Sequence, residues 1–166
     1  MKFILNSIAF VAIVLSISNC GVPLYSKEEF QNLSTPEISY NRELTVLKTK
    51  LTDKYTILFI RYENVRASGP NKKKLVNEIS FSPEAILTET NGTREFEFIK
   101  AQGITIEPKK MLVHGGESVD FVVYFRRLEK GIEHFGLYEC EDRFNLTCWN
   151  IDDISVSNPS DSTAPK

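Results

Sequence analysis

The sequence lacks the charge imbalance that nucleic-acid binding requires. Its 20 Lys and Arg residues stand against 22 Asp and Glu residues, which gives a formal charge of −2. Without a strong positive field, the chain has no electrostatic means of holding a phosphate backbone by counterion release. We therefore expect no nucleic-acid partner.

Histidine is scarce as well, which argues against a catalytic metal centre. His114 and His134 are the only two histidines, and neither has further ligands at a telling spacing. The His114-Gly115-Gly116 stretch is similar to the oxyanion-hole segment of lipases, but the sequence has no G-x-S-x-G nucleophile motif, so a plain β-turn is favoured. We expect no catalytic residue, no metal site and no cofactor.

Acidic residues near the C-terminus are potential oxygen ligands for calcium. They are Glu139, Glu141, Asp142, Asp152 and Asp153. They lack the glycine and the alternating spacing of an EF-hand loop. A solvated acidic edge that discourages strand pairing between molecules is the favoured interpretation, with a calcium site as the weaker alternative.

The apolar run at the N-terminus is too short for a typical membrane-spanning helix. Lys2 precedes it, and it covers residues 3–17, about 15 residues where about 20 are needed. A short apolar run behind a positive charge is typical of a secretory signal. Ser16 and Ser18 have the small side chains that an ordinary signal peptidase needs for a cut before Asn19.

The residues that end this run also resemble the lipobox of bacterial lipoproteins. Leu15, then Ile17-Ser18-Asn19 and Cys20-Gly21, carry the resemblance. Asn19 stands where Gly, Ala or Ser is usual, as in the relaxed lipobox of spirochaetes such as Leptospira. The resemblance implies a signal peptide at 1–19, diacylglycerol on Cys20, and anchoring in the outer membrane or at the cell surface. A soluble secreted product is the alternative.

The two remaining cysteines form an even pair if Cys20 is lipidated. Cys140 and Cys148 would then face an oxidising compartment. Their surroundings predict two short strands joined by residues 141–147, which can bring the cysteines opposite each other. We expect a Cys140–Cys148 disulfide, with two buried thiols as the alternative, and the spacing does not suit zinc.

Between residues 43 and 157 the dominant hydrophobic period is two, as expected for half-buried strands. Val119, Phe121, Val123 and Phe125 share one face of the clearest example. The predicted strands are 44–51, 55–64, 78–81, 94–98, 104–107, 119–125, 132–140 and 146–151, with 55–64 apolar on both faces and therefore central. Turn residues separate these runs. The pattern predicts an all-β, antiparallel β-sandwich of about seven or eight strands.

Three features follow one another along the chain: the strand at 55–64, the stretch Ile104-Thr105-Ile106-Glu107-Pro108, and the His114-Gly115-Gly116-Glu117 turn. This order resembles immunoglobulin-like domains of bacterial exported lipoproteins. A Gly116-Glu117 turn precedes the strongest strand, and this resemblance implies an immunoglobulin-like sandwich at 43–157. The preceding residues 20–42 are polar and contain two prolines, which predicts a tether that lifts the domain off the membrane. Residues 158–166 lack apolar side chains except for one alanine and are expected to be a disordered tail.

Two classes of function follow from this organisation. The favoured one is a non-enzymatic, lipid-anchored module that binds a macromolecular partner of the host or of the envelope. Tyr62, Tyr124 and Trp149 are candidates for an exposed aromatic face, with a core position as an equal alternative for each and as the safer prediction for Trp149. The alternative is a soluble, small-molecule-binding or hydrolytic domain whose site is scattered in sequence. A broad apolar patch favours the first class, and a deep cleft favours the second.

Overall fold

The chain folds into strands joined by short connections. The computed structural model describes residues 25, 29–30, 33, 38–39, 43–65, 75–140 and 148–160, so the predicted signal peptide and Cys20 lie outside the described residues. Within these ranges the strands are β1 (Ile38–Ser39), β2 (Leu44–Leu51), β3 (Tyr55–Glu63), β4 (Val76–Ile79), β5 (Ile86–Glu89), β6 (Glu95–Gln102), β7 (Met111–His114), β8 (Ser118–Arg126), β9 (His134–Tyr138) and β10 (Asn150–Ser155). The all-β prediction is confirmed.

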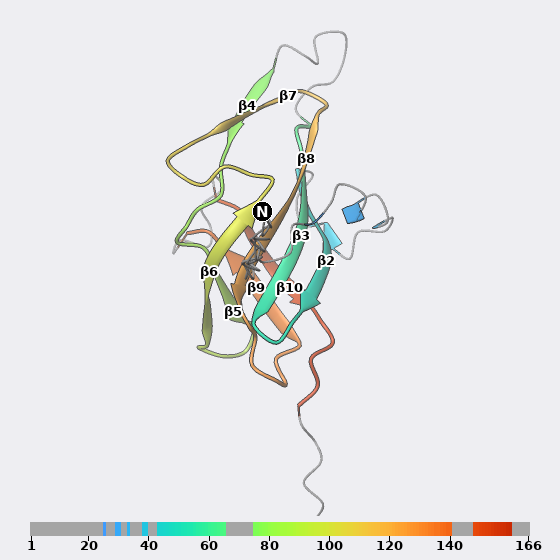
Figure 1. Cartoon of the computed structure of the whole chain (residues 1–166), viewed down its shortest axis with the longest axis vertical. Helices are drawn as coiled ribbons and strands as arrows, with labels where there is room; N and C mark the ends of the chain where they lie inside the picture. The colour runs from blue at the N-terminus through green and yellow to red at the C-terminus, as the bar shows by residue number, and fades with distance from the viewer. Residues whose placement is uncertain are drawn as a thin grey trace, which may run out of the picture.

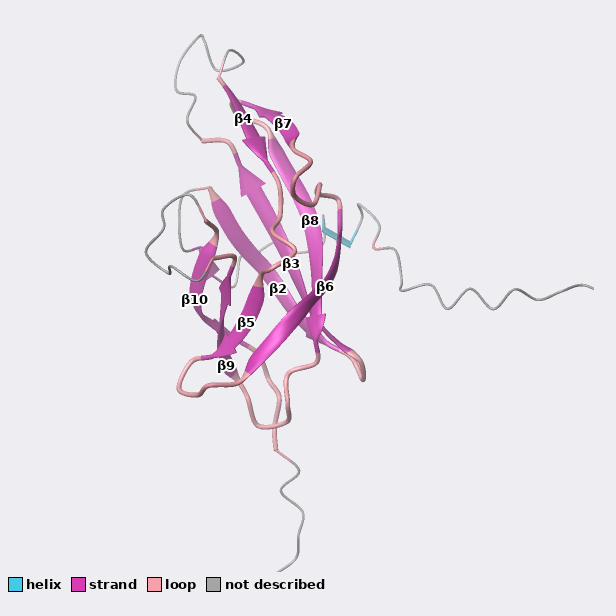
Figure 2. Cartoon of the chain, turned by 90° about the vertical axis from the view of Figure 1, so that its left-hand side faces the viewer, coloured by secondary structure: helices cyan, strands magenta, loops and turns pink. Residues whose placement is uncertain are grey.

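One antiparallel sheet, bent through β6, makes both layers of the sandwich. Its strand order is β1-β2-β3-β8-β6-β5-β9-β10. The first half of β6 pairs with β5, and the second half, from Phe98 onward, pairs with β8 after a register shift between Phe98 and Lys100. Figure 2 shows β2, β3 and β8 on one side and β5, β9 and β10 on the other. The two-layered sandwich is confirmed, and its layers are continuous.

A separate two-stranded ribbon, β4 paired with β7, extends from one end of the sandwich. Figure 1 shows it at the top of the longest axis, with the C-terminal part of the chain at the opposite end. The turn from β7 to β8 is the predicted glycine turn. Gly116 has a φ of +81°, and the Glu117 amide donates to the His114 carbonyl at 2.9 Å.

The main core lies between the two layers, where the period-two pattern directs one face of each strand. Phe121, Val123 and Phe125 of β8 are fully buried there, opposite Leu87 of β5 and Leu137 of β9. Alternate residues of β3 and β8 point away from this core into a second apolar cluster. β3 lies between β2 and β8 and is apolar on both faces, so the prediction of a central strand is confirmed.

The packed structure extends beyond the domain limits expected at residues 43 and 157. Ile38 and Ser39 of β1 pair with Val46 and Thr45 of β2, so part of the expected tether joins the sheet edge. At the other end Asn158 is buried, and its side-chain amide donates to the carbonyls of Glu129 and Ile132 at 2.7 and 2.9 Å. Asn158 therefore belongs to the domain and not to a tail.

Several strands differ from the predicted ones for local reasons. Residues 104–107 form no strand, because Gly103 turns the chain away from β6 with a φ of +86° and only Ile106 bridges to Phe81. The short strands β5 and β7 lack a clear alternation and were not predicted. The last strand starts at Asn150, where residues 146–151 were expected, and it bulges between Ile151 and Ile154.

Candidate functional site

The two downstream cysteines meet as predicted. A Cys140–Cys148 disulfide joins the end of β9 to the start of β10, with Cα atoms 6.1 Å apart. β9 and β10 are antiparallel neighbours, which is the arrangement that brings the two cysteines together. The disulfide links the two strands at one end of the layer formed by β5, β9 and β10.

The histidines and the described acidic residues do not converge on a site. His134 Nδ1 lies 3.1 Å from Asp153 Oδ1 at the surface, and the Tyr138 hydroxyl donates to Asp152. His114 is exposed on β7, and residues 141–147 lie outside the described residues. In the described part of the chain, no group of three His, Cys, Asp or Glu side chains is arranged to hold a metal ion.

The buried carboxyl group of Glu139 was not predicted, because it was counted with a solvated acidic edge. Its Oε1 accepts the Ser82 amide at 3.0 Å and its Oε2 accepts the Trp149 amide at 2.9 Å. Burial, with a smaller contribution from nearby Glu107, raises the pKa of Glu139 to about 7 against the opposing effect of these two hydrogen bonds. Glu139 therefore fixes the loop before β5 and the start of β10 to the end of β9.

The three aromatic candidates for an exposed face are packed instead. Tyr62 and Tyr124 are fully buried, so the core alternative holds for both and neither forms an exposed aromatic surface. Trp149 stacks on Tyr62 and Phe121, with ring centroids 5.6 and 5.7 Å away, as the core prediction for Trp149 required. The rings fill the end of the main core near the disulfide.

The layer of β2, β3 and β8 carries a second apolar cluster on the side that points away from the main core, here called the outer face. It consists of Leu47, Ile57, Phe59, Val122 and Tyr124. Three residues of the N-terminal segment, Tyr25, Phe30 and Leu33, pack against it. The Tyr25 ring lies edge-on to Phe59 at 4.7 Å, and Phe30 is buried against Phe59 at 5.5 Å. These three described residues of the expected tether thus cover this face.

Lysines flank the outer face on both sides. Lys50 of β2 lies over the Tyr25 ring at 5.4 Å, and Lys100 of β6 lies over the Tyr124 ring at 4.7 Å. Partial burial lowers the pKa of Lys100 and raises the pKa of Tyr124 to about 12. These ammonium groups therefore rest on aromatic rings at the rim of the face.

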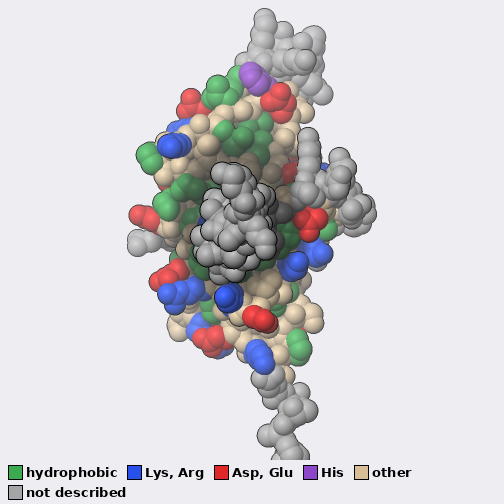
Figure 3. Space-filling model, in the orientation of Figure 1, with side chains coloured by type: hydrophobic (Ala, Val, Ile, Leu, Met, Phe, Trp, Pro, Cys, Tyr) green, Lys and Arg blue, Asp and Glu red, His purple; other side chains and the backbone are tan. Residues whose placement is uncertain are grey.

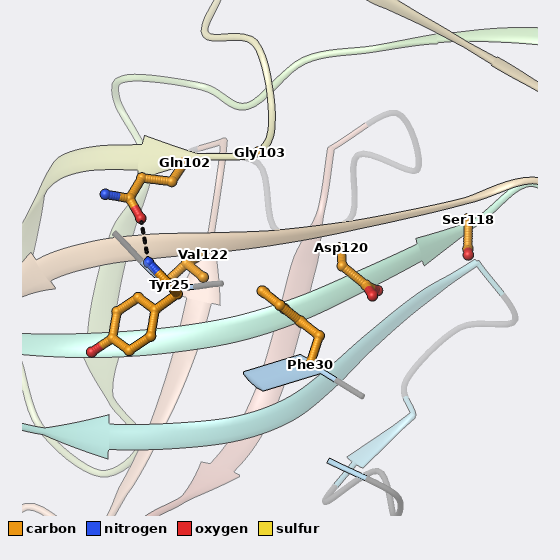
Figure 4. Close-up of a pocket in the computed structure, with 7 residues that line it drawn as sticks. All are labelled: Tyr25, Phe30, Gln102, Gly103, Ser118, Asp120 and Val122. Atoms are coloured by element: carbon orange, nitrogen blue, oxygen red, sulfur yellow. Dashed lines mark hydrogen bonds between the residues drawn. The ribbon is translucent and has the colours of Figure 1, made fainter. Parts of the chain in front are cut away.

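A cleft of about 370 Å³ opens between the N-terminal segment and the sheet. Figure 4 shows its lining residues, which are Tyr25, Phe30, Gln102, Gly103, Ser118, Asp120 and Val122. The Gln102 side-chain oxygen accepts the Tyr25 amide at 3.5 Å and the Tyr124 hydroxyl at 3.3 Å. These bonds join the N-terminal segment to β6 and β8 at the wall of the cleft.

The cleft offers binding groups but no nucleophile and base in contact. Both Asp120 oxygens accept from the Arg61 guanidinium, at 2.7 and 2.9 Å, and this pairing raises the pKa of Arg61. The charge of Asp120 is therefore neutralised inside the protein. Among the described lining residues, Ser118 is the only serine or threonine and none is a histidine. The arrangement suits weak binding better than acid–base chemistry.

The β4–β7 ribbon exposes apolar side chains. Val76 on β4 is 42% exposed and Leu112 on β7 is 60% exposed, and they are diagonal neighbours on the same face of the ribbon. Leu75, just before β4, is 49% exposed, and Val65, just after β3, is 41% exposed. Figure 3 shows apolar side chains gathered at this end of the molecule. We call these four residues the apolar ribbon.

Buried hydrogen bonds hold the ribbon in place. Asn77 on its inner side donates to the Tyr62 hydroxyl at 2.7 Å, and Asn64 donates to the Val113 carbonyl at 2.9 Å. The Gly115 amide also donates to the Leu75 carbonyl at 2.7 Å. The exposed side chains are thus presented on a backbone that is already ordered, which lowers the entropic cost of binding.

No protein-family model, curated protein or solved structure matches the chain. The described residues contain no helix with the length and apolarity to cross a membrane.

Proposed function

We propose that the protein is a lipid-anchored, non-enzymatic lipoprotein of the outer membrane or cell surface whose sandwich binds a protein partner through the apolar ribbon. The lipobox resemblance at Cys20 supports the anchor. The binding role is inferred from the exposure of Leu75, Val76 and Leu112 on an ordered ribbon. Single exposed apolar side chains are common on protein surfaces, whereas several at one end of a domain are typical of a contact surface.

The ribbon has the features of a contact surface for another protein. β4 and β7 pair only with each other among the described strands, so each presents an edge to which an extended segment can be added. The apolar side chains would bury against the partner together with Glu78, which lies directly opposite Leu112 on the same face and 3.7 Å from Lys110. A partner with an apolar strand or groove, from the envelope or the host, fits this surface.

Site-specific photocrosslinking tests the binding role. A benzophenone amino acid at Leu112 is expected to give one discrete crosslinked protein in intact cells. The matched control is Ile99 on β6, which is 43% exposed but lies outside the ribbon. A Leu75→Ser change should weaken the crosslink from Leu112. Equal products from both positions, or a crosslink unaffected by Leu75→Ser, would contradict the assignment.

The anchor has its own test. The intact mass of the protein from its native membrane should correspond to a chain that starts at Cys20 and carries diacylglycerol. A chain that starts at Asn19 without acyl groups would refute the anchor and favour a soluble secreted protein.

The cleft supports a second candidate function. Its volume of about 370 Å³ and its mixed lining suit a small ligand, as expected for a small-molecule-binding domain. Enlarging Ser118 to Trp would then abolish ligand binding in a calorimetric screen of the purified protein. An open cleft with a neutralised carboxylate makes this candidate weaker than partner binding.

A further inference from the structure

The N-terminal segment limits how far the sandwich can stand from its lipid anchor. If all of residues 20–42 were a free tether, it could reach about 80 Å when fully extended. Tyr25, however, is already packed on the outer face, in ring contact with Phe59 and hydrogen-bonded to Gln102. Only four residues separate Cys20 from Tyr25, and the five Cα-to-Cα steps between them span at most about 18 Å.

The point of attachment lies on a broad side of the molecule. Figure 4 shows Tyr25 and Phe30 over β3 and β8, and Figure 1 views this side along the shortest axis of the chain. Because at most about 18 Å of chain connects the lipidated Cys20 to Tyr25 on this side, the outer face is the part of the sandwich nearest to the bilayer. The long axis of the sandwich would then run along the membrane, with the apolar ribbon at one end.

The charges on this side suit an anionic surface. Lys48 and Lys50 of β2 are exposed beside the N-terminal segment, and Lys100 lies on the opposite rim of the outer face. Within the described residues these three lysines form no ion pair, whereas the neighbouring Arg126 is paired with Glu97 at 3.0 Å.

The carboxylates on this side leave a positive excess. Asp120 is paired with Arg61, Glu63 also lies near Arg61, and Glu29 stands beside Lys48 and Lys50. Against these three carboxylates stand four basic groups, which are Arg61, Lys48, Lys50 and Lys100. Figure 3 shows basic side chains around the middle and lower part of this side.

We infer that the docked N-terminal segment orients the sandwich with its outer face against the membrane, where Lys48, Lys50 and Lys100 contact anionic lipid headgroups. The inference rests on the proposed anchor at Cys20. The rings of the outer face are already covered by the N-terminal segment, so the lysines at its rim make the contact, because their ammonium groups can reach the lipid phosphates. The ribbon would then meet partners that lie on or in the same membrane.

Headgroup quenching of two matched probes tests this orientation. The full chain is exported and acylated in a bacterial host, purified, and reconstituted in vesicles of phosphatidylcholine with or without phosphatidylglycerol. A fluorophore is attached through Ser118→Cys on the outer side of β8 or through Ser155→Cys on β10, in the opposite layer; both serines are exposed. Lipids with a nitroxide headgroup should quench the first probe more strongly than the second, above all with phosphatidylglycerol.

Two variants separate the segment from the lysines. The double variant Lys48→Gln, Lys50→Gln should lower about 25-fold the ratio of molecules whose outer face lies on the membrane to molecules that rotate freely on the anchor. Each lysine contributes about fivefold to this ratio. Lys109→Gln with Lys110→Gln is the charge-matched control on the chain leading into β7 and should leave the quenching unchanged. Tyr25→Ser should remove the difference between the probes while the thermal unfolding of the sandwich stays cooperative.

The outcomes distinguish this inference from the proposed function. Equal quenching of both probes in a protein whose mass confirms acylation would overturn the orientation and leave the anchor standing. A mass without acyl groups would overturn both. Protection of the Ser118 probe from an aqueous quencher, without quenching by the lipid nitroxide, would place a second copy or another protein on the outer face and would also overturn the inference.

Discussion

Replacement of Glu139 by glutamine should make the stability of the sandwich much less dependent on pH. In the folded protein this carboxyl group is buried at the end of β9 and bonded to the amides of Ser82 and Trp149. Glutamine has nearly the same shape and keeps one acceptor oxygen, but it never carries a charge. The change therefore removes the cost of burying a carboxylate while it forfeits one good hydrogen bond, worth about 1 kcal/mol.

The sign of the effect follows from the raised pKa. Folding moves the pKa of Glu139 from 4.5 to about 7, so in this window the folded state holds a proton that the unfolded state has released. The associated stability is complete below pH 4.5 and is lost as the pH rises through 7. At about 1.36 kcal/mol per pH unit, the unfolding free energy lost between pH 5 and pH 8 amounts to about 2 to 3 kcal/mol.

Urea unfolding followed by tryptophan fluorescence measures this loss directly. Trp149 is the only tryptophan, and its backbone amide is bonded to Glu139. The unfolding free energy of Glu139→Gln should rise relative to the parent protein by about 2 to 3 kcal/mol between pH 5 and pH 8. Glu95→Gln, at an exposed position on β6, should show no such trend. Parallel pH profiles for the parent and Glu139→Gln would refute the reasoning.

Three further changes should alter stability by amounts that local geometry sets. Asn158→Ala should lower the unfolding free energy by about 2 to 4 kcal/mol, because the buried carbonyl of Ile132 and the partly buried carbonyl of Glu129 lose their donor; an effect below 0.5 kcal/mol in urea titrations would place Asn158 in a frayed end. Gly103→Ala should lower the melting temperature more than Gly116→Ala, since both have positive φ but only Gly103 places a new Cβ 2.7 Å from a backbone oxygen. Loss of the disulfide in a Cys140→Ser, Cys148→Ser protein should cost about 2.5 kcal/mol for a separation of eight residues, and an unchanged urea midpoint would contradict that role.

The elements that the sequence predicted well are those whose pattern is local. Val119 to Phe125 alternate at period two whatever they pack against, so β8 was placed within a residue of its true ends. Tyr55 to Asn64 is apolar on both faces, and only a strand with neighbours on both sides buries such a pattern. The Cys140–Cys148 pairing followed from an even pair flanking one hairpin.

What the sequence could not predict depends on which distant strands become neighbours. Nothing near Glu139 in the chain indicates that Ser82, more than fifty residues away, supplies an amide to its carboxylate. Tyr124 has the spacing of an outward residue on β8, and it is buried only because Tyr25 and Phe30 return to cover that face.

The sequence by itself determined the all-β class, the central strand, the disulfide hairpin and the turn before β8. Each of these depends on side-chain alternation or backbone preference within a few residues, and such local properties do not depend on the tertiary contacts. Only the tertiary structure decided that Glu139 is buried, that Asn158 belongs to the domain and that the supposed tether covers the outer face. Burial is a property of the surfaces that meet, and those surfaces come from segments that the chain brings together only when the sheet closes through β6.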